Sequence, residues 1–174
     1  LEAGRLICID KDDFALQQAK TRLATFADKI AFIHSDFRRA KQVVEDLGLK
    51  GVDGMLFDLG VSSPQLDDPS RGFSYMQDAP LDMRMDSSSS LTAFDVVNAC
   101  SPEDLARIFF EYGEERYSRR IASAIEKARS EKPIRTTFEL VEIIRSAMPT
   151  PALREKQHPA KRCFQAIRIE VNDE

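Results

Sequence analysis

The sequence has few residues of the kinds that build disulfide frameworks and metal sites. Three cysteines and two histidines stand in 174 residues, and no Cys-x-x-Cys pair is present. An odd number of scattered cysteines argues against a disulfide framework or a zinc site and favours a reducing compartment. We therefore expect no metal, and we expect the cysteines to serve as small packing residues.

Long apolar stretches are also missing. No run approaches the roughly 20 residues needed to span a bilayer, and the opening Leu-Glu-Ala-Gly-Arg has no signal-peptide pattern. These absences predict a soluble, cytoplasmic protein with no membrane partner. The first residue is not methionine and the last residues stop inside a helical pattern, so we expect a chain cropped at both ends. Its length favours one domain plus an elaboration.

Charge is distributed unevenly along the chain. Residues 115–168 hold 13 Lys or Arg against 6 Asp or Glu, whereas the remainder holds 12 against 23. A basic segment on an acidic core suits contact with a phosphate backbone. The candidates for such contacts are Arg116, Arg119, Arg120, Lys132 and Arg135. Taken singly, each is better explained as a charge that solvates a helix face.

Strand and helix patterns alternate in the first third of the chain. Apolar runs at residues 5–10, 30–34 and 52–59 predict strands, and helical spacing separates them. Asp12 or Asp13 can cap the first of these helices. This alternation predicts right-handed parallel crossovers, and hence an α/β fold with a Rossmann-like, doubly wound sheet.

Helices dominate after residue 68. Residues 69–90 show neither period, which predicts a long loop of a kind that is usually functional or disordered. Helix start signals follow at Thr92, Ser101 and Thr136, and one further helix is expected at about residues 114–130. The predicted domains are a partial core at 1–68, a helical insertion at 69–157 and a helix returning to the core at 158–174.

Acidic residues follow the three predicted strands, as Asp10, Asp36 and Asp58. Carboxyl ends of parallel strands share one edge of a sheet, where a carboxylate commonly accepts hydrogen bonds from the ribose hydroxyls of a nucleotide-like cofactor. Asp36 with Phe37 would suit an adenine. The pattern fits NAD or S-adenosylmethionine equally, and Asp10 can alternatively cap the next helix.

The most informative stretch is Asp-Leu-Gly-Val-Ser-Ser-Pro-Gln at residues 58–65. An apolar strand is expected to end on Asp58 and break into a loop that holds small polar groups over the sheet edge. A buried carboxylate there would be retained for hydrogen-bonded or charged partners. The alternative is a tight surface turn, since such turns are often rich in Gly, Ser and Pro.

This stretch and four others resemble the bacterial 16S ribosomal RNA cytosine-N4 methyltransferase family (RsmH, also called MraW). The similar stretches, in the family's order, are residues 58–68, 71–76, 80–86, 112–116 and 158–169. Within them stand Arg-Gly-Phe-Ser-Tyr-Met, Tyr-Gly-Glu-Glu-Arg and His-Pro-Ala-Lys-Arg. The loop at 58–65 occupies the place where amino-methyltransferases hold the target amine, a motif that a hydride-transfer enzyme rarely needs.

The resemblance implies a class I methyltransferase core that binds S-adenosyl-L-methionine, with the insertion serving substrate recognition. It implies methylation of the exocyclic N4 amine of a cytosine in 16S ribosomal RNA, free or within the small ribosomal subunit. Matching positions place Asp10 at the ribose, Phe37 beside the adenine, Asp58 near the methionine moiety and Gln65 in the loop beyond. The family's glycine-rich loop and its Ser-Phe-His-Ser segment have no counterpart in these 174 residues.

Several roles stay open from the sequence. Asp58, a main-chain carbonyl of residues 60–64 or Ser63 can accept the hydrogens of the amine, and no catalytic residue is assigned. His158 can contact phosphate, orient the insertion or cap a helix, whereas His34 lies in a strand and is expected to be structural. The candidates for stacking on a flipped base are Tyr75, Phe73 and Arg84; core packing is an equal alternative for the phenylalanine. Rival functions are a non-catalytic RNA-binding scaffold and a dinucleotide-dependent oxidoreductase.

Overall fold

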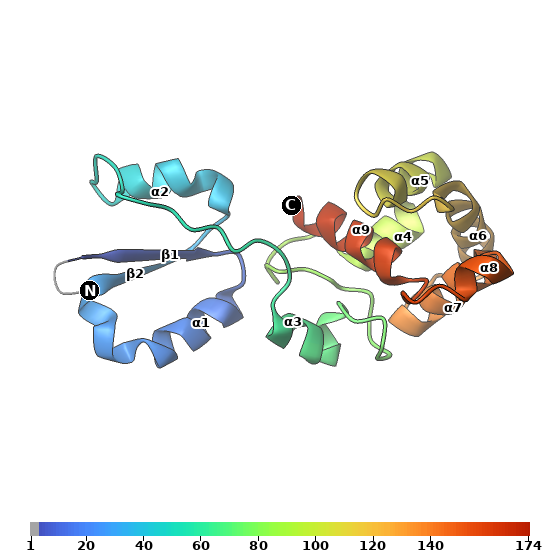
Figure 1. Cartoon of the computed structure of the whole chain (residues 1–174), viewed down its shortest axis with the longest axis horizontal. Helices are drawn as coiled ribbons and strands as arrows, with labels where there is room; N and C mark the ends of the chain where they lie inside the picture. The colour runs from blue at the N-terminus through green and yellow to red at the C-terminus, as the bar shows by residue number, and fades with distance from the viewer. Residues whose placement is uncertain (1–3) are drawn as a thin grey trace. The chain divides into compact units, whose positions relative to one another are not determined.

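The computed structural model describes residues 4–174 and divides them into two compact units (Figure 1). The first, which we call the sheet unit, holds the chain up to Leu59 together with Met85–Ser87. The second, the helical unit, holds Gly60–Arg84 and Ser88–Glu174. The protein is therefore mixed α/β, and each unit is described separately.

Two parallel strands form the centre of the sheet unit. Strand β1 (Leu6–Asp10) pairs with β2 (Ile30–His34) in a register that sets Asp10 opposite His34. The prediction of parallel strands joined by a helical crossover is confirmed at these two positions. The crossover consists of α1 (Asp13–Arg22) and the 3-10 helix η1 (Ala24–Lys29).

Helices cover both faces of this small sheet. Figure 1 shows α1 on one side of the two strands and α2 (Ala40–Asp46) on the other. The 3-10 turn η2 (Phe37–Arg39) links β2 to α2. Leu16 of α1 and Val43 of α2 are the buried apolar residues of these two helices.

The predicted strand at residues 52–59 is not formed. Among the described residues only β1 and β2 are strands, and they pair with each other. Residues 51–60 are all exposed, including Leu56 at 94% and Leu59 at 65% of their full accessible surface. A strand requires a neighbour to satisfy its backbone groups, and apolar content alone does not supply one. The expectation that Asp58 ends a strand is therefore wrong for this structure.

The helical unit contains eight helical segments in the described chain. They are α3 (Ser63–Asp67), η3 (Pro69–Arg71), α4 (Ala93–Ala99), α5 (Pro102–Glu111), α6 (Ser118–Glu131), α7 (Thr137–Ala147), α8 (Thr150–Leu153) and α9 (Lys161–Asn172). No described helix is both long and apolar enough to cross a membrane. The core lies between α5, α6, α7 and α9. Its fully buried side chains include Phe109, Leu105, Ile121, Ile125, Leu140, Ile144 and Ile167.

Local capping signals set the helix starts. The predicted caps are confirmed, because the side chains of Thr92, Ser101 and Thr136 each accept a hydrogen bond from the backbone N–H three residues later. The helix expected from about residue 114 begins later, at Ser118. Glu114 has a φ of 51°, a left-handed conformation that a right-handed helix does not accept.

Buried polar side chains hold the long loop before α4 against the helices. Thr137 is fully buried; its Oγ1 donates to the Gln77 carbonyl at 2.7 Å and accepts from the Ala79 N–H at 3.0 Å. At the other end of the unit, Asn172 Nδ2 donates to the Met83 carbonyl at 2.7 Å. The loop that showed no period in the sequence thus takes its conformation from residues far along the chain.

Candidate functional site

The carboxyl edge of the sheet brings together three of the four predicted cofactor residues. Asp10 ends β1 and is exposed, and its backbone carbonyl accepts a hydrogen bond from Ser35 at 3.0 Å. Its Oδ1 accepts from the Asp12 N–H at 2.8 Å, while Asp12 itself caps α1 by accepting from Phe14. The cap of α1 is therefore Asp12, so the Asp10 carboxylate remains at the sheet edge.

A contact between two aromatic rings links Phe37 to the segment that carries Asp58. Phe37 opens η2 directly after β2 and is 40% exposed. Its ring meets Phe57 edge to face, with 6.3 Å between centroids. This contact brings the segment carrying Asp58, which is exposed, to the end of the sheet that holds Phe37 and Asp10.

Gln65, the fourth predicted residue, belongs to the helical unit. It is 6% exposed, and its Oε1 accepts from the Ser62 N–H at 2.9 Å, which satisfies the start of α3. The structure thus gives this side chain a capping role. Its predicted role beside the cofactor stays a prediction.

The carboxylate of Asp36 is paired with two cations. Arg38 donates through Nε to Oδ1 at 3.0 Å and through Nη2 to Oδ2 at 2.7 Å, and Lys11 Nζ lies 2.8 Å from Oδ2. The hydrogen bonds from Arg38, and then those of Lys11, hold the pKa of the Asp36 carboxyl far below its usual range despite partial burial. An adenine amine would compete with these partners for its oxygens.

A second candidate site forms where residues 112–116 meet the start of α9. Arg162 Nη1 donates to the Glu114 carbonyl at 3.2 Å, and Gln165 Nε2 donates to the Tyr112 carbonyl at 3.3 Å. Between them, a Cβ added to Gly113 would lie 2.5 Å from the Arg162 carbonyl oxygen. Only glycine permits this approach, so two of the sequence stretches identified above are locked together in space.

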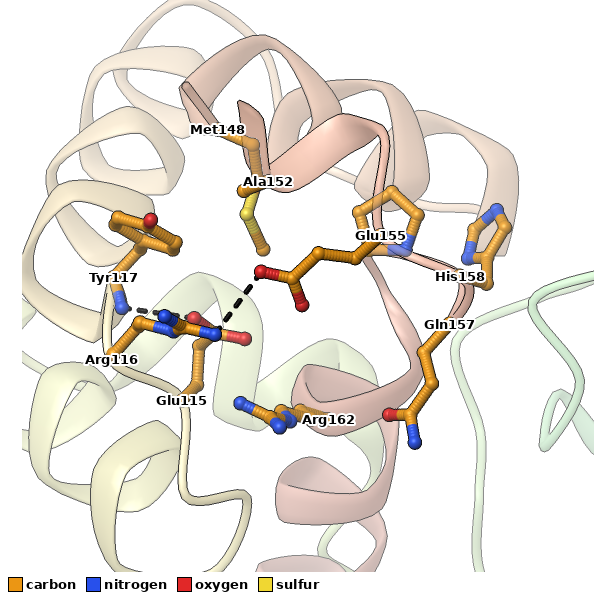
Figure 2. A pocket seen from close by; sticks show the side chains of 10 residues that line it. Glu115, Arg116, Tyr117, Met148, Ala152, Glu155, Gln157, His158 and Arg162 are labelled. Atoms are coloured by element: carbon orange, nitrogen blue, oxygen red, sulfur yellow. Dashed lines mark hydrogen bonds and ion pairs between the residues drawn. The ribbon is translucent and has the colours of Figure 1, made fainter. Parts of the chain in front are cut away.

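A narrow cleft opens beside this junction (Figure 2). Arg116 Nη2 forms an ion pair with Glu155 Oε1 at 3.1 Å across it. Glu115 is 3% exposed, and its Oε1 accepts from the Tyr117 N–H at 2.9 Å. We call this the α6–α9 cleft; its lining residues include Glu115, Arg116, Tyr117, Glu155, His158 and Arg162.

His158 lies at the wall of this cleft, in the turn before α9. Its Nδ1 accepts from the Ala160 N–H at 3.2 Å, just before α9, and its ring stacks on Tyr75 at 4.6 Å between centroids. Burial, and then the nearby Arg145, lower the pKa of His158 below its usual 6.5. The N-cap of α9 is Ala160, and no side chain caps this helix, so His158 orders the turn before α9 and does not cap the helix.

Comparison with known proteins shows the family. The family model described as "MraW methylase family" matches residues 1–174. The chain belongs to this family. It is also 58% identical over 173 residues to a protein of Brevibacillus brevis named "Ribosomal RNA small subunit methyltransferase H", covering 99% of this chain and 55% of the relative. The chain thus spans about half the length of that curated relative, and the resemblance seen in the sequence is confirmed.

Membership of the MraW methylase family implies a class I methyltransferase fold, which agrees with the parallel strands and crossover helices of the sheet unit. The structure sorts the predicted stacking residues. Phe73 is 5% exposed, so its core alternative is the observed one. Arg84 pairs with Asp82 at 2.7 Å and donates to the Ser89 carbonyl at 2.7 Å. Tyr75 already has one ring face against His158.

The structure also separates the predicted backbone-contact cations of this MraW family member. Lys132 is paired with Glu139 at 2.6 Å, and Arg135 lines a different groove of the helical unit. Arg116 lines the α6–α9 cleft, while Arg119 and Arg120 are exposed on the first turn of α6. Among residues 4–174 no group of three or more His, Cys, Asp or Glu could hold a metal ion.

The sequence patterns gave Gly113 only a role as a helix end and gave Glu115 no role. Both stand in the quoted Tyr-Gly-Glu-Glu-Arg stretch, but their roles depend on the approach of Arg162 and on burial in the cleft. The usable signal was a pair of adjacent acids followed directly by an arginine inside a stretch that carried the resemblance. That signal marks the stretch without telling which carboxylate is buried.

Proposed function

We propose that this chain is part of an S-adenosyl-L-methionine-dependent methyltransferase that methylates the N4 amine of a cytosine in 16S ribosomal RNA. The observation that carries the proposal is the match of the MraW methylase family over the whole chain. The name of the relative, "Ribosomal RNA small subunit methyltransferase H", supports the same substrate class. The proposed partner is accordingly 16S ribosomal RNA, free or in the small subunit.

The residues at the sheet edge fit the proposed cofactor. Asp10 offers an exposed carboxylate at the end of β1, where two ribose hydroxyls can donate to it. The half-exposed ring of Phe37 can cover one face of an adenine. Asp58 would lie near the methionine moiety, and Gln65 in the loop beyond. The cofactor supplies a methyl group made electrophilic by its bond to a sulfonium.

The protein's own task in this reaction is positioning. The cytosine amine must lie in line with the methyl–sulfur bond, and its hydrogens need acceptors as it becomes nucleophilic. Asp58, a carbonyl of residues 60–64 or Ser63 can supply that acceptor. We also propose that residues 69–157 form the substrate-recognition insertion, with 158–174 returning to the core formed by residues 1–68.

Isothermal titration tests the cofactor assignment. S-adenosylmethionine is titrated into the full-length protein, with NAD as the control ligand. Binding of S-adenosylmethionine alone supports the proposal. Binding of NAD alone would replace it with an oxidoreductase, and binding of neither would favour a non-catalytic RNA-binding scaffold.

Substitution of Asp58 tests the site. Asp58→Ala in the full-length protein should abolish methyl transfer to 16S ribosomal RNA while largely sparing RNA affinity, because the carboxylate acts at the cofactor and the amine. Asp53→Ala, in the same exposed segment, is the matched control and should leave both unchanged. Equal loss of methylation and RNA affinity in the Asp58 variant would show a structural role instead.

A further inference from the structure

The α6–α9 cleft carries a charge pattern that the proposed methyl transfer does not use. Its lining includes residues 115–117, 155, 157–159 and 162. The two segments that carry these residues, 114–120 and 154–162, hold seven Lys or Arg against three Glu. One of the acids, Glu155, is neutralised by Arg116 at 3.1 Å. A second, Glu115, is buried. The third, Glu114, is exposed, so the exposed residues of these two segments, which we call the rim, carry an excess of cations.

Several rim cations remain available to a ligand. Arg119 and Arg120 on the first turn of α6, and Lys161 on the first turn of α9, are exposed, and none of them forms an ion pair with residues 4–174. Several exposed cations on the two segments beside one cleft hold a polyanion better than any one of them alone, because each phosphate that is neutralised releases counterions. This distinguishes the rim from Lys132, which already has a carboxylate partner.

Glu115 gives the floor of the cleft a different chemistry. It is 3% exposed, and its Oε1 is bonded to the Tyr117 N–H. From the described part of the chain, no hydrogen bond reaches the other oxygen, Oε2. Among the described residues no side-chain oxygen is both fully buried and without a partner, so this oxygen is open to the cleft. A ligand group that donates a hydrogen bond can therefore reach it, and a hydrogen bond to a charged acceptor is among the stronger ones.

The size of the cleft selects the kind of donor. Its cavity volume is about 20 Å³, enough for one water molecule or one hydroxyl group but not for a nucleobase. In a single RNA strand a hydroxyl of this size stands next to each phosphate, on the ribose. The 2′-hydroxyl is also the group by which a protein distinguishes RNA from DNA.

We propose that the α6–α9 cleft binds the sugar–phosphate backbone of single-stranded RNA. Arg119, Arg120 and Lys161 contact phosphates at the rim, and Glu115 Oε2 accepts a hydrogen bond from a ribose 2′-hydroxyl at the floor. The proposal rests on the proposed function, since it concerns the RNA that the methyltransferase would act on. It adds an RNA-reading surface in the helical unit, and its readout is binding rather than methylation.

The rim is tested by the salt dependence of binding. A labelled single-stranded RNA of mixed sequence is titrated with the full-length protein at several salt concentrations by fluorescence anisotropy. Arg119→Gln/Lys161→Gln should reduce the slope of log affinity against log salt by about 1.4, because two phosphate contacts are lost at about 0.7 each. The matched control Lys20→Gln/Lys127→Gln removes the same charge from two exposed positions outside the cleft segments and should leave the slope nearly unchanged. An equal reduction in both would overturn the proposal.

The floor is tested by sugar preference. The unmodified protein should bind this RNA about tenfold more tightly than DNA of the same sequence, the effect expected for one hydrogen bond to a charged group. Glu115→Gln keeps the acceptor for Tyr117 and should remove most of that preference while DNA affinity stays the same. No preference in the unmodified protein, or a variant that loses RNA and DNA affinity equally, would overturn the ribose contact.

These results stand apart from the proposed activity. A protein that shows the predicted slopes and sugar preference but transfers no methyl group supports the cleft while removing the methyltransferase proposal. If the protein transfers methyl groups fully but the rim and floor variants bind RNA as the unmodified protein does, the methyltransferase proposal is supported and the cleft proposal is removed. Melting curves by circular dichroism, run on every variant, separate a lost contact from a lost fold.

Discussion

Gly113 offers the sharpest test of how the α6–α9 cleft is built. In Gly113→Ala the new Cβ would lie 2.5 Å from the Arg162 carbonyl oxygen and 2.9 Å from the Phe109 carbonyl oxygen. Close C···O contacts in proteins begin at about 3.3 Å, so the methyl overlaps one oxygen by about 0.8 Å. Both oxygens are backbone atoms and cannot rotate away. The start of α9 must therefore shift from the end of α5.

A forced shift of packed elements costs about 1–3 kcal/mol of unfolding free energy. Urea unfolding, followed by helix circular dichroism, measures it directly. Gly51→Ala is the control, because its new Cβ meets nothing within 4 Å, and its unfolding free energy should stay within about 0.5 kcal/mol of the unmodified protein. If Gly113→Ala is as stable as that control, the close approach of the two segments is wrong.

The same variant should also weaken RNA binding. Moving α9 separates Lys161 and Arg162 from the Arg116 side of the cleft, and the Arg162–Glu114 hydrogen bond of 3.2 Å would be strained or lost. The anisotropy titration described above should then show lower affinity at low salt with a smaller salt slope. An unchanged slope together with lower stability would place the RNA backbone elsewhere.

Three further predictions concern stability. Thr137→Val should lower the unfolding free energy by at least about 1–3 kcal/mol, because two buried backbone groups lose their partner; the exposed Thr150→Val is its control in the same urea assay. Lys132 and neighbouring backbone N–H groups lower the pKa of Glu139 from 4.5 to about 2, so its stabilising effect is complete above pH 4.5 and is lost as pH falls toward 2. In Glu139→Gln the melting midpoint should change less with pH over that range. The pKa of His158 lies below 6.5 in the folded protein, so the unfolded chain binds the proton more readily and stability should fall as pH drops through the range below 6.5; a melting midpoint that is unchanged there, or changes equally in His158→Gln, would contradict this.

Features encoded by neighbouring residues were predictable from the sequence. The caps at Thr92, Ser101 and Thr136 depend on a side chain and a backbone group three residues apart, and all three are formed. The strands at residues 6–10 and 30–34 follow from short apolar runs, and their parallel pairing follows from the helix between them. In these cases local geometry and the tertiary structure favour the same conformation.

Residues 52–59 show where such reasoning fails. Their apolar content is that of a buried strand, yet Leu56 is 94% exposed and the segment makes no strand pairing in the described chain. A single sequence pattern reports what a segment can do when its backbone has a partner, and it carries no information on whether that partner is present. Asp58 therefore keeps its predicted role only as a proposal, although Phe57 contacts Phe37 as a shared edge would require.

The basic residues illustrate the same limit at the candidate RNA site. Sequence reasoning could count the charges of residues 115–168 but could not rank them, because an arginine that solvates a helix and one that awaits a phosphate are identical in sequence. Burial and pairing distinguish them: Lys132 has Glu139 at 2.6 Å, whereas Arg119 and Lys161 have no ion-pair partner among residues 4–174. The buried carboxylate of Glu115 then adds what charge alone lacks, a directional acceptor within a cationic rim. A surface that only attracted polyanions would bind RNA and DNA alike, so sugar preference is the property that separates a recognition site from a charged face.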